Sequence, residues 1–342
     1  MKDLFSLDAY DYELPQELIA QYPIEPRDHA RLLIVNRKSG RIEEARVYEL
    51  ASLLQSGDGL IFNNTRVLHA RLYGHLISGK RVEILLIKSI EPTVWQVLAK
   101  PARDLSPGTV VQFSEAVQGT VQAISESGGR IMQFSQEITP ELLQGIGTVP
   151  LPPYIRREPN IDIDAERYQT VYGSEYGSVA APTAGLHFTH DLFNKLHDAG
   201  IAQHMVTLHV GTGTFLPIRT EDVREHHMHT ELVEVTKESA QALNAISGRR
   251  IAVGTTSCRV LESVAQTCGT IFPQNKETDL FIYPGYQFKY IDALFTNFHT
   301  PRSSLLVLVA ALMGYELMQE AYRKAIEKKF RFFSYGDAML IL

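Results

Sequence analysis

The spacing of hydrophobic residues divides the chain into three stretches. In residues 1 to 65, segments with helical spacing, LPQELIAQ (14–21) and YELASLL (48–54), alternate with strand-like segments, RLLIVN (31–36) and GLIFNN (59–64). From about residue 68 the pattern changes to short strand-like segments separated by Gly, Ser and Pro: ARLYGHL (70–76), RVEILLIK (81–88), VWQVLAK (94–100), TVVQFS (109–114), TVQAIS (120–125) and RIMQFS (130–135). This close spacing predicts a small antiparallel barrel or sandwich.

A connector with three prolines, GTVPLPPYI (147–155), ends that stretch, because proline precludes a regular helix or a central strand. Helical and strand patterns then alternate again. THDLFNKLHDAG (189–200) is typical of an amphipathic helix with Thr189 as N-cap and Gly200 just past its end. The remaining segments are IAQHMVTLHV (201–210), RRIAVGTTSCRVLESVA (249–265), LFIYPGY (280–286), ALFTNF (293–298), SSLLVLVAALM (303–313) and RFFSYGDAMLIL (331–342).

Together these patterns predict a multidomain α/β protein. The mixed α/β main domain is built from both chain ends, residues 1–67 and 151–342, and a small antiparallel β-barrel domain, residues 68–150, is inserted into it. IAQHMVTLHV, LFIYPGY and ALFTNF are expected to be strands, and SSLLVLVAALM a helix.

Composition narrows the class of protein. With 44% hydrophobic and 21% charged residues among 342, the chain can bury a core. Its longest apolar run, LLVLVAALM (305–313), is shorter than the roughly 20 residues that span a bilayer, and the first residues lack a signal-peptide pattern, so we expect a cytoplasmic protein. The net charge of −6 does not indicate nucleic-acid binding. Cys258 and Cys268 alone cannot build a disulfide framework or a zinc site.

Three loops each place one histidine among small, hydroxyl or amide side chains. They are APTAGLHFT (181–189), TLHVGTGTF (207–215) and TNFHTPRSS (296–304). His187, His209 and His299 thus follow expected strands or precede a helix, where α/β sheets place ligands. A single histidine of this kind is more often structural, but three in similar settings favour one shared site.

The segment VGTTS (253–257) follows an expected strand and begins an expected helix. Free backbone N–H groups and the helix dipole at such a start favour an anion, either a carboxylate or a phosphate. The segment lacks the lysine of a P-loop and the glycines of a dinucleotide fingerprint, so ATP and NAD are poorly supported. Ordinary helix capping is the equally weighted alternative.

The segment HHMHTE (226–231) is the one cluster with metal-ligand composition. If it is extended, His227, His229 and Glu231 share a face and could bind zinc, although solvated or core-edge histidines are the commoner explanation. Cys258 at a helix start could act as a nucleophile, but a small buried cysteine is the commoner role.

Motifs along nearly the whole chain resemble the S-adenosylmethionine:tRNA ribosyltransferase-isomerases of queuosine biosynthesis. They are NNTRV (63–67), PLPPYI (150–155), RYQTVY (167–172), APTAGLHFT, TLHVG.GTF, H.MH.E (226–231), VGTTS.R (253–259), PGY.F (284–288), TNFH.P (296–301) and FRFFSYGDAML (330–340). The barrel stretch carries the fewest of these motifs.

The resemblance implies transfer and isomerisation of the ribosyl group of S-adenosylmethionine onto 7-aminomethyl-7-deazaguanine at the tRNA wobble position. Adenine and methionine leave, and epoxyqueuosine is formed in the tRNA. The implied scheme removes a proton from ribose C5′, which the sulfonium acidifies, and needs an acid for the adenine and walls that tolerate a cation. S-adenosylmethionine is then a cosubstrate, no tightly bound cofactor or metal is expected, and we expect a monomer.

The resemblance also marks candidate site residues. His187, His209 and His299 are the candidates for proton transfer, without an assignment of base and acid. His187 is preferred, because the helix starting near Thr189 would lower its pKa and keep it neutral. The implied substrate-binding residues are Arg66, Tyr168, Thr170, Thr183, Gly185, Thr207, Gly211, Gly213, Thr214, Phe215, His226, His229, Glu231, Gly254, Thr255, Thr256, Ser257, Arg259, Asn297 and Asp337.

Two readings from other classes compete with this enzyme. A noncatalytic RNA-binding protein would use the barrel, yet residues 66 to 157 carry ten Lys or Arg against seven Asp or Glu, an excess too small to indicate a basic binding face. A zinc-dependent hydrolase would depend on HHMHTE, and metal analysis of the purified protein separates it from the transferase.

Overall fold

A nine-stranded mixed sheet forms the body of the molecule in the computed structural model, which describes residues 3–125, 128–157, 161–211 and 218–342. Its order is β16 (Gln274–Thr278), β14 (Glu231–Val235), β13 (Ala202–Leu208), β3 (Gly59–Asn63), β15 (Arg250–Val253), β17 (Ala293–Asn297), β18 (Ala338–Ile341), β1 (Arg31–Val35) and β2 (Ile42–Arg46). β13, β3, β15 and β17 run parallel to one another. The first and last strands of the chain, β1 and β18, pair in parallel, so both chain ends build this sheet.

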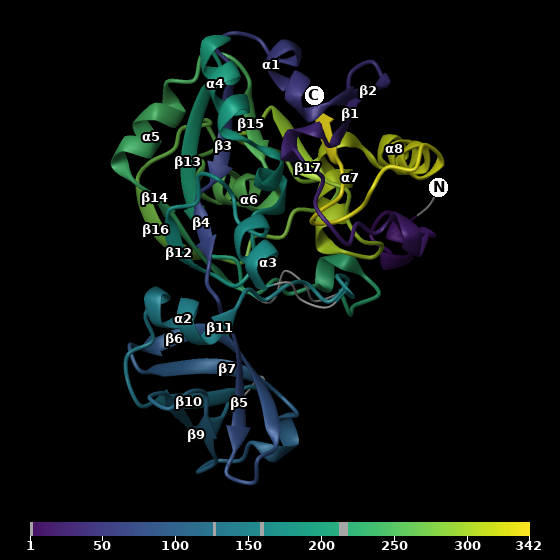
Figure 1. The fold of residues 1–342 in the computed structure, drawn as a ribbon. Coiled ribbons are helices and arrows are strands. Elements are labelled where there is room, and N and C mark those ends of the chain that lie inside the picture. Colours follow the sequence, from purple (N-terminus) through teal and green to yellow (C-terminus); the bar gives the residue numbers. More distant parts are fainter. Residues whose placement is uncertain (1–2, 126–127, 158–160, 212–217) are drawn as a thin grey trace.

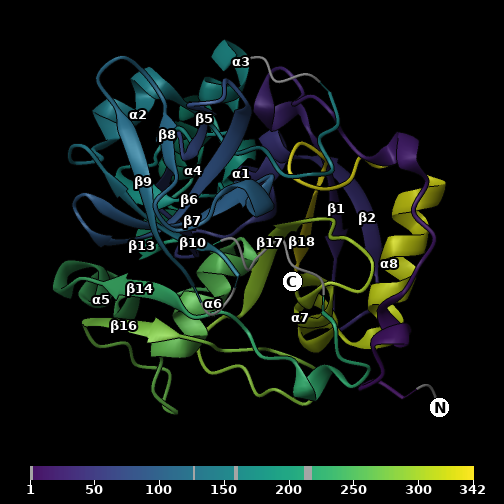
Figure 2. The ribbon, with the colours of Figure 1, turned by 90° about the horizontal axis from the view of Figure 1, so that it is seen from below.

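Helices cover both faces of this sheet (Figures 1 and 2). One face packs on α5 (Lys237–Asn244), α6 (Thr255–Val264), α7 (Ser304–Met313) and α8 (Tyr315–Glu327), and the other on α1 (Leu50–Leu53) and α4 (His190–Asp198). In β3, Ile61 belongs to the first cluster while Leu60 and Phe62 belong to the second. Because both faces are covered, all five residues of β3 are buried, which explains its continuous apolar run.

A closed ring of six antiparallel strands forms the second body (Figure 1). Its order is β5 (Arg71–Leu76), β6 (Arg81–Glu91), β7 (Val94–Lys100), β10 (Arg130–Phe134), β9 (Gln118–Ile124) and β8 (Val110–Gln112), which pairs again with β5. β11 (Gly147–Thr148), after α2 (Pro140–Ile146), adds to β5, and β4 (Thr65–Val67) pairs with β12 (Glu175–Ser178) where the two bodies join. A separate hydrophobic cluster fills the ring.

The remaining elements are short. They are α3 (Ile161–Arg167) and the 3-10 turns η1 (Leu7–Tyr10), η2 (Gln16–Leu18), η3 (Arg27–His29), η4 (Val47–Glu49), η5 (Ala102–Asp104), η6 (Thr183–His187) and η8 (Val223–Glu225). Of the helices described, none is by itself both long and apolar enough to cross a membrane; α7 and α8 reach that length only as a pair bent by 116°.

The predicted fold class, a mixed α/β body with an antiparallel barrel, is confirmed. The six barrel strands lie where the alternation places them, and Thr189 caps α4 as expected. The strand expected in LFIYPGY was wrong: no strand lies there, and Gly285 adopts φ +102° directly after a proline. The boundaries at 67/68 and 150/151 remain a proposal about which residues fold as units.

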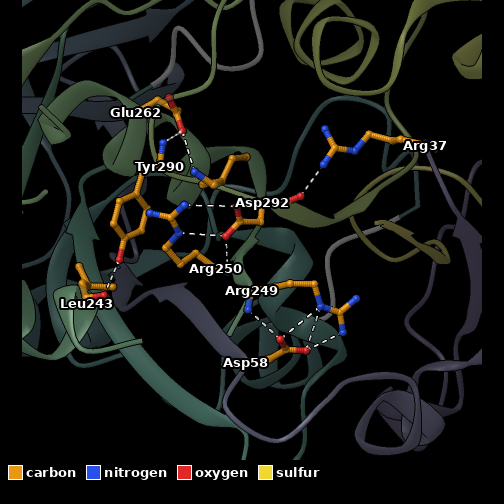
Figure 3. A network of polar contacts seen from close by, with 9 residues as sticks. Arg37, Asp58, Leu243, Arg249, Arg250, Glu262, Tyr290 and Asp292 are labelled. Carbon is orange, nitrogen blue, oxygen red and sulfur yellow. Dashed lines mark hydrogen bonds and ion pairs between the residues drawn. The ribbon is translucent and has the colours of Figure 1, made fainter. Parts of the chain in front are cut away.

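Ion pairs tie the amino ends of the parallel strands together (Figure 3). Asp58, just before β3, accepts hydrogen bonds from the guanidinium of Arg249 at 2.6 Å and from its backbone N–H at 2.8 Å. Asp292, just before β17, accepts the same two kinds of bond from Arg250 at 2.9 Å. These contacts hold the amino ends of β3, β15 and β17 in register. The cavity described below lies at the opposite, carboxyl ends of β15 and β17.

Replacing Asp58 by Asn is expected to lower the free energy of unfolding by about 2 kcal/mol at pH 7, because a buried charge-assisted pair is lost. Burial raises the pKa of Asp58, but hydrogen bonds from Arg249 and Gln55 outweigh burial and lower it overall. The contribution is therefore present above the unfolded pKa of about 4 and is lost as the pH falls through the folded value. Urea titrations of both proteins at pH 7 and at pH 3 measure this, and a difference in the free energy of unfolding that grows on acidification would contradict it.

Candidate active site

A cavity, called here the main cavity, lies at the carboxyl ends of β15 and β17, which are neighbours in the sheet. Its empty volume is about 1010 Å³, including the open mouth. The segments that line it are 153–154, 180–184, 254–256, 296–303 and 333–334. Parallel strands of α/β proteins bind ligands in this position, because the loops that follow adjacent strands meet there.

The start of α6 forms one wall of the cavity. Gly254 ends β15 and caps the helix with φ +90°, a conformation that costs other residues strain. No side chain caps this helix start. The hydroxyl of Thr256 is buried without a hydrogen-bond partner among the residues described, and Thr255 also lines the cavity. The strand, glycine turn and helix expected from VGTTS are confirmed, and the geometry suits an anion.

A second helix start faces the same cavity. Ser303 caps α7, and its hydroxyl accepts a hydrogen bond from the backbone N–H of Leu306 at 3.3 Å. Arg302, beside it, reaches Asp8 at 2.5 Å and Asp11 at 3.6 Å. The sequence analysis missed these residues, although a serine directly before an apolar helix is a recognisable N-cap. Two positive helix ends therefore converge on one cavity.

His299 lines the cavity and is only 8% exposed. Its Nε2 lies 3.0 Å from the hydroxyl of Thr296, and its backbone carbonyl accepts a hydrogen bond from Tyr12. Burial lowers the pKa of His299 to about 3. The imidazole is therefore neutral near pH 7 and able to accept a proton.

His187 lines a smaller, neighbouring hollow rather than the main cavity. Its Nε2 accepts a hydrogen bond from Nδ2 of Asn297 at 3.1 Å, and the carbonyl oxygen of that amide accepts one from Thr183 at 3.3 Å. Asn297 and Thr183 line the main cavity, so they link the two spaces. Burial, and then the positive charges of Arg331 and Arg27, lower the pKa of His187 to about 3. The pKa of His187 is lowered as the sequence predicted, but the main cause is burial and not the helix that follows.

His209 lies apart from both spaces. Its Nδ1 is 3.2 Å from the hydroxyl of Thr65 in β4, and burial lowers its pKa. Val210, the next residue, lines the main cavity, whereas His209 lines neither that cavity nor the smaller hollow. The expectation that three histidines share one cavity is corrected: His299 is in it, His187 touches it through Asn297, and His209 is outside.

Glu231 and Arg259 form a buried ion pair with each other. The Glu231 carboxylate also accepts a hydrogen bond from the backbone N–H of Gly211 at 3.3 Å. The sequence predicted that Arg259 would assist anion binding at the start of α6, but the Nη1 atom of its guanidinium group pairs with Glu231 instead.

The histidines of HHMHTE lie beside this ion pair in the sequence. Burial and the neighbouring histidines, His229 among them, lower the pKa of His226. Within the described ranges no three His, Cys, Asp or Glu side chains are grouped as metal ligands.

Three other predicted site residues make contacts within the protein. The Thr207 hydroxyl donates to the side chain of Asn64 at 2.8 Å, and the Ser257 hydroxyl donates at 2.8 Å to the carbonyl four residues earlier. The Asp337 carboxylate accepts two backbone N–H groups at 2.9 and 2.7 Å, joining β1 to the turn before β18. Three further predicted residues, Gly213, Thr214 and Phe215, lie outside the described residues.

The other predicted residues surround the loop that precedes η6. Tyr168 and Thr170 are buried, and Arg66 donates a hydrogen bond at 3.1 Å to the carbonyl of Gly173. A Cβ at Gly185 would lie 1.9 Å from a tyrosine hydroxyl, so only glycine fits there. None of these four lines the main cavity. Of the predicted set, Thr183, Gly254, Thr255, Thr256, Asn297 and His299 line it.

Aromatic walls of the cavity were also missed. Tyr154 packs against Phe333, with ring centroids 4.7 Å apart, and its hydroxyl shares a hydrogen bond with Ser334. Burial raises the pKa of Tyr154 to about 12. Tyr154 lies in the motif PLPPYI and Phe333 in the motif FRFFSYGDAML. The sequence therefore marked both segments, but it did not indicate that these two aromatic side chains line the cavity.

A mixed sheet whose parallel strands open onto a deep cavity with two helix starts defines an α/β enzyme of the kind that binds nucleotide-like ligands. The chain belongs to the family of queuosine biosynthesis proteins, whose model matches residues 7–341.

Relatives and one solved structure agree with this assignment. An S-adenosylmethionine:tRNA ribosyltransferase-isomerase from Symbiobacterium thermophilum is 49% identical over 98% of this chain and 99% of its own. One of the same name from Thermosynechococcus vestitus is 49% identical over 99% and 97%. The crystal structure of an S-adenosylmethionine tRNA ribosyltransferase from Thermotoga maritima has a TM-score of 0.54 and 38% identity, covering 98% of this chain and 100% of that one.

Proposed function

We propose that this chain is an S-adenosylmethionine:tRNA ribosyltransferase-isomerase. It transfers and isomerises the ribosyl group of S-adenosylmethionine onto the aminomethyl group of 7-aminomethyl-7-deazaguanine at the tRNA wobble position, releasing adenine and methionine. Identity to relatives of that name over almost the full chain supports the reaction. The observation that carries it structurally is a neutral, buried His299 in a cavity bounded by two helix starts and aromatic walls.

The chemistry divides among the walls of the cavity. The first step needs a base for the ribose C5′ proton, and the neutral imidazole of His299 meets that need. The departing adenine needs a proton donor, a role open to Tyr154 or to a water molecule. The rings of Tyr154 and Phe333 provide faces that tolerate the sulfonium and the positive charge that develops on the sugar.

Anion recognition falls to the helix starts. The methionine carboxylate of S-adenosylmethionine would accept hydrogen bonds from the backbone N–H groups at the start of α6 and from the Thr256 hydroxyl. Arg259, expected one turn further along α6 to assist, pairs with Glu231 through Nη1.

Replacing Thr256 by Val is expected to weaken S-adenosylmethionine binding about tenfold, because a hydrogen bond to a charged group contributes about 1.5 kcal/mol. Isothermal titration calorimetry measures this directly. Ser263→Ala, on the same helix but bonded only to its own backbone, is the control for changes in helix stability. If Thr256→Val and the unaltered protein bind S-adenosylmethionine with equal affinity, the Thr256 hydroxyl does not contact the methionine carboxylate.

The experiment that tests the function is incubation with S-adenosylmethionine and tRNA carrying 7-aminomethyl-7-deazaguanine, followed by mass spectrometry of the nucleosides. Epoxyqueuosine and free adenine are the expected products. A noncatalytic RNA-binding protein would bind the tRNA but release no adenine, so that result would reject the proposal.

A further inference from the structure

A second hollow adjoins the main cavity at Ser334. It is lined by Arg27, Arg167, His187 and Tyr335, together with the apolar edge of Ile24 and its neighbours. Four segments of the chain supply these side chains: the turn at η3, the end of α3, the end of η6 and the loop before β18. None of the residues proposed above to bind S-adenosylmethionine lines it.

Positive side chains gather around this hollow. Arg27 donates to the backbone carbonyls of Gln169 and Glu166 at 2.6 and 3.0 Å and forms no ion pair with any described carboxylate. The guanidinium of Arg331, whose charge acts on His187, likewise donates only to carbonyls, whereas Arg167 pairs with the exposed Glu25. The charges of Glu166 and Asp337 act on Arg27 and Arg331 from a distance, but neither carboxylate forms an ion pair with these guanidinium groups.

Unused donors point to the same place. The hydroxyl of Tyr335 is buried, with the residue 3% exposed, and has no hydrogen-bond partner among the residues described. Nε of Arg167, which also lines the hollow, is buried without a partner among the residues described. Buried donors in folded proteins are normally satisfied, and each one left unpaired costs about 1 to 3 kcal/mol. Two such donors beside the guanidinium group of Arg27 are what an oxyanion would satisfy.

We propose that this hollow is an oxyanion site that holds a phosphodiester group of the RNA substrate through Arg27, Arg167 and the Tyr335 hydroxyl. The proposal depends on the proposed function for the identity of the RNA. A nucleotide whose base enters the main cavity carries its phosphate groups at the cavity's rim, and Ser334 and the His187–Asn297 contact join the two spaces. Arginine pairs bind phosphate oxygens with defined geometry and so orient the nucleic acid.

Two variants separate binding from folding. Arg27→Gln removes one charge, so tRNA affinity should fall about tenfold near 0.1 M salt, and the slope of log K against log salt should decrease by about 0.7 to 1. Tyr335→Phe removes only the unpartnered hydroxyl, so tRNA affinity should fall about fivefold without loss of thermal stability, which a purely structural role would not produce. Arg323→Gln, an exposed charge on α8 paired with Glu320, is the control and should change neither.

The measurements are fluorescence anisotropy with tRNA carrying 7-aminomethyl-7-deazaguanine between 50 and 200 mM KCl, and calorimetry with S-adenosylmethionine alone. Weaker tRNA binding with unchanged S-adenosylmethionine affinity supports the proposal. Weaker S-adenosylmethionine binding with unchanged tRNA binding would assign the hollow to the methionine carboxylate and overturn it, as would unchanged affinity for both. The unaltered protein could release no adenine while Arg27→Gln still lowers the slope of log K for tRNA against log salt. That result would reject the proposed ribosyl transfer and support the phosphate site.

Discussion

His299→Ala is expected to reduce adenine release by about 100-fold or more while leaving the protein folded. The imidazole is the proposed proton-transfer group in the main cavity, and general-base catalysis contributes about 100- to 10,000-fold. Burial lowers its pKa to about 3, so the ring is neutral at physiological pH, although a pKa this low also makes it a weaker base than a free imidazole. His187→Ala should also reduce turnover, because His187 accepts the hydrogen bond that orients the Asn297 amide at the cavity wall.

Adenine release is measured with modified tRNA at saturating S-adenosylmethionine, and thermal melts and S-adenosylmethionine titrations establish that each variant folds and binds. His209→Ala is the matched control, since His209 is partly buried but lies outside the cavity, and its turnover should stay within a few-fold. Near-normal adenine release by folded His299→Ala and His187→Ala proteins would reject the histidine assignment and direct attention to Tyr154.

Arg259→Met is expected to lower the free energy of unfolding by about 3 to 5 kcal/mol, because it removes the guanidinium group of a buried ion pair with Glu231. Both side chains are nearly inaccessible, at 6% and 4% exposure, so water cannot replace the lost partner. The pair joins α6 to the start of β14, and its loss should loosen one wall of the cavity.

Urea denaturation of the single variant and of Arg259→Met combined with Glu231→Gln measures this effect. The double variant should be more stable than Arg259→Met alone, since the buried negative charge of Glu231 is removed as well. A single variant within 1 kcal/mol of the unaltered protein would show that the pair contributes little.

Local patterns were sufficient for much of the fold. The barrel strands were predictable because each alternates buried and exposed residues between Gly, Ser or Pro turns, as in β6. α4 was predictable from Thr189 and Gly200 at its two ends. α5 and α8 were not predicted, although both have one polar and one apolar face.

The sequence by itself determined which residue types follow each strand: a glycine turn with three hydroxyl residues after β15, and Asn297 and His299 around the end of β17. Only the tertiary structure decided which of these loops meet. β15 and β17 are adjacent, so their loops share the cavity, whereas β3 separates β13 from β15. Side chains alternate along an extended segment, so Val210 reaches the cavity while His209 turns to Thr65. Strand order arises from long-range pairing, which no local pattern encodes, and for that reason three similar histidine loops came to occupy three different places.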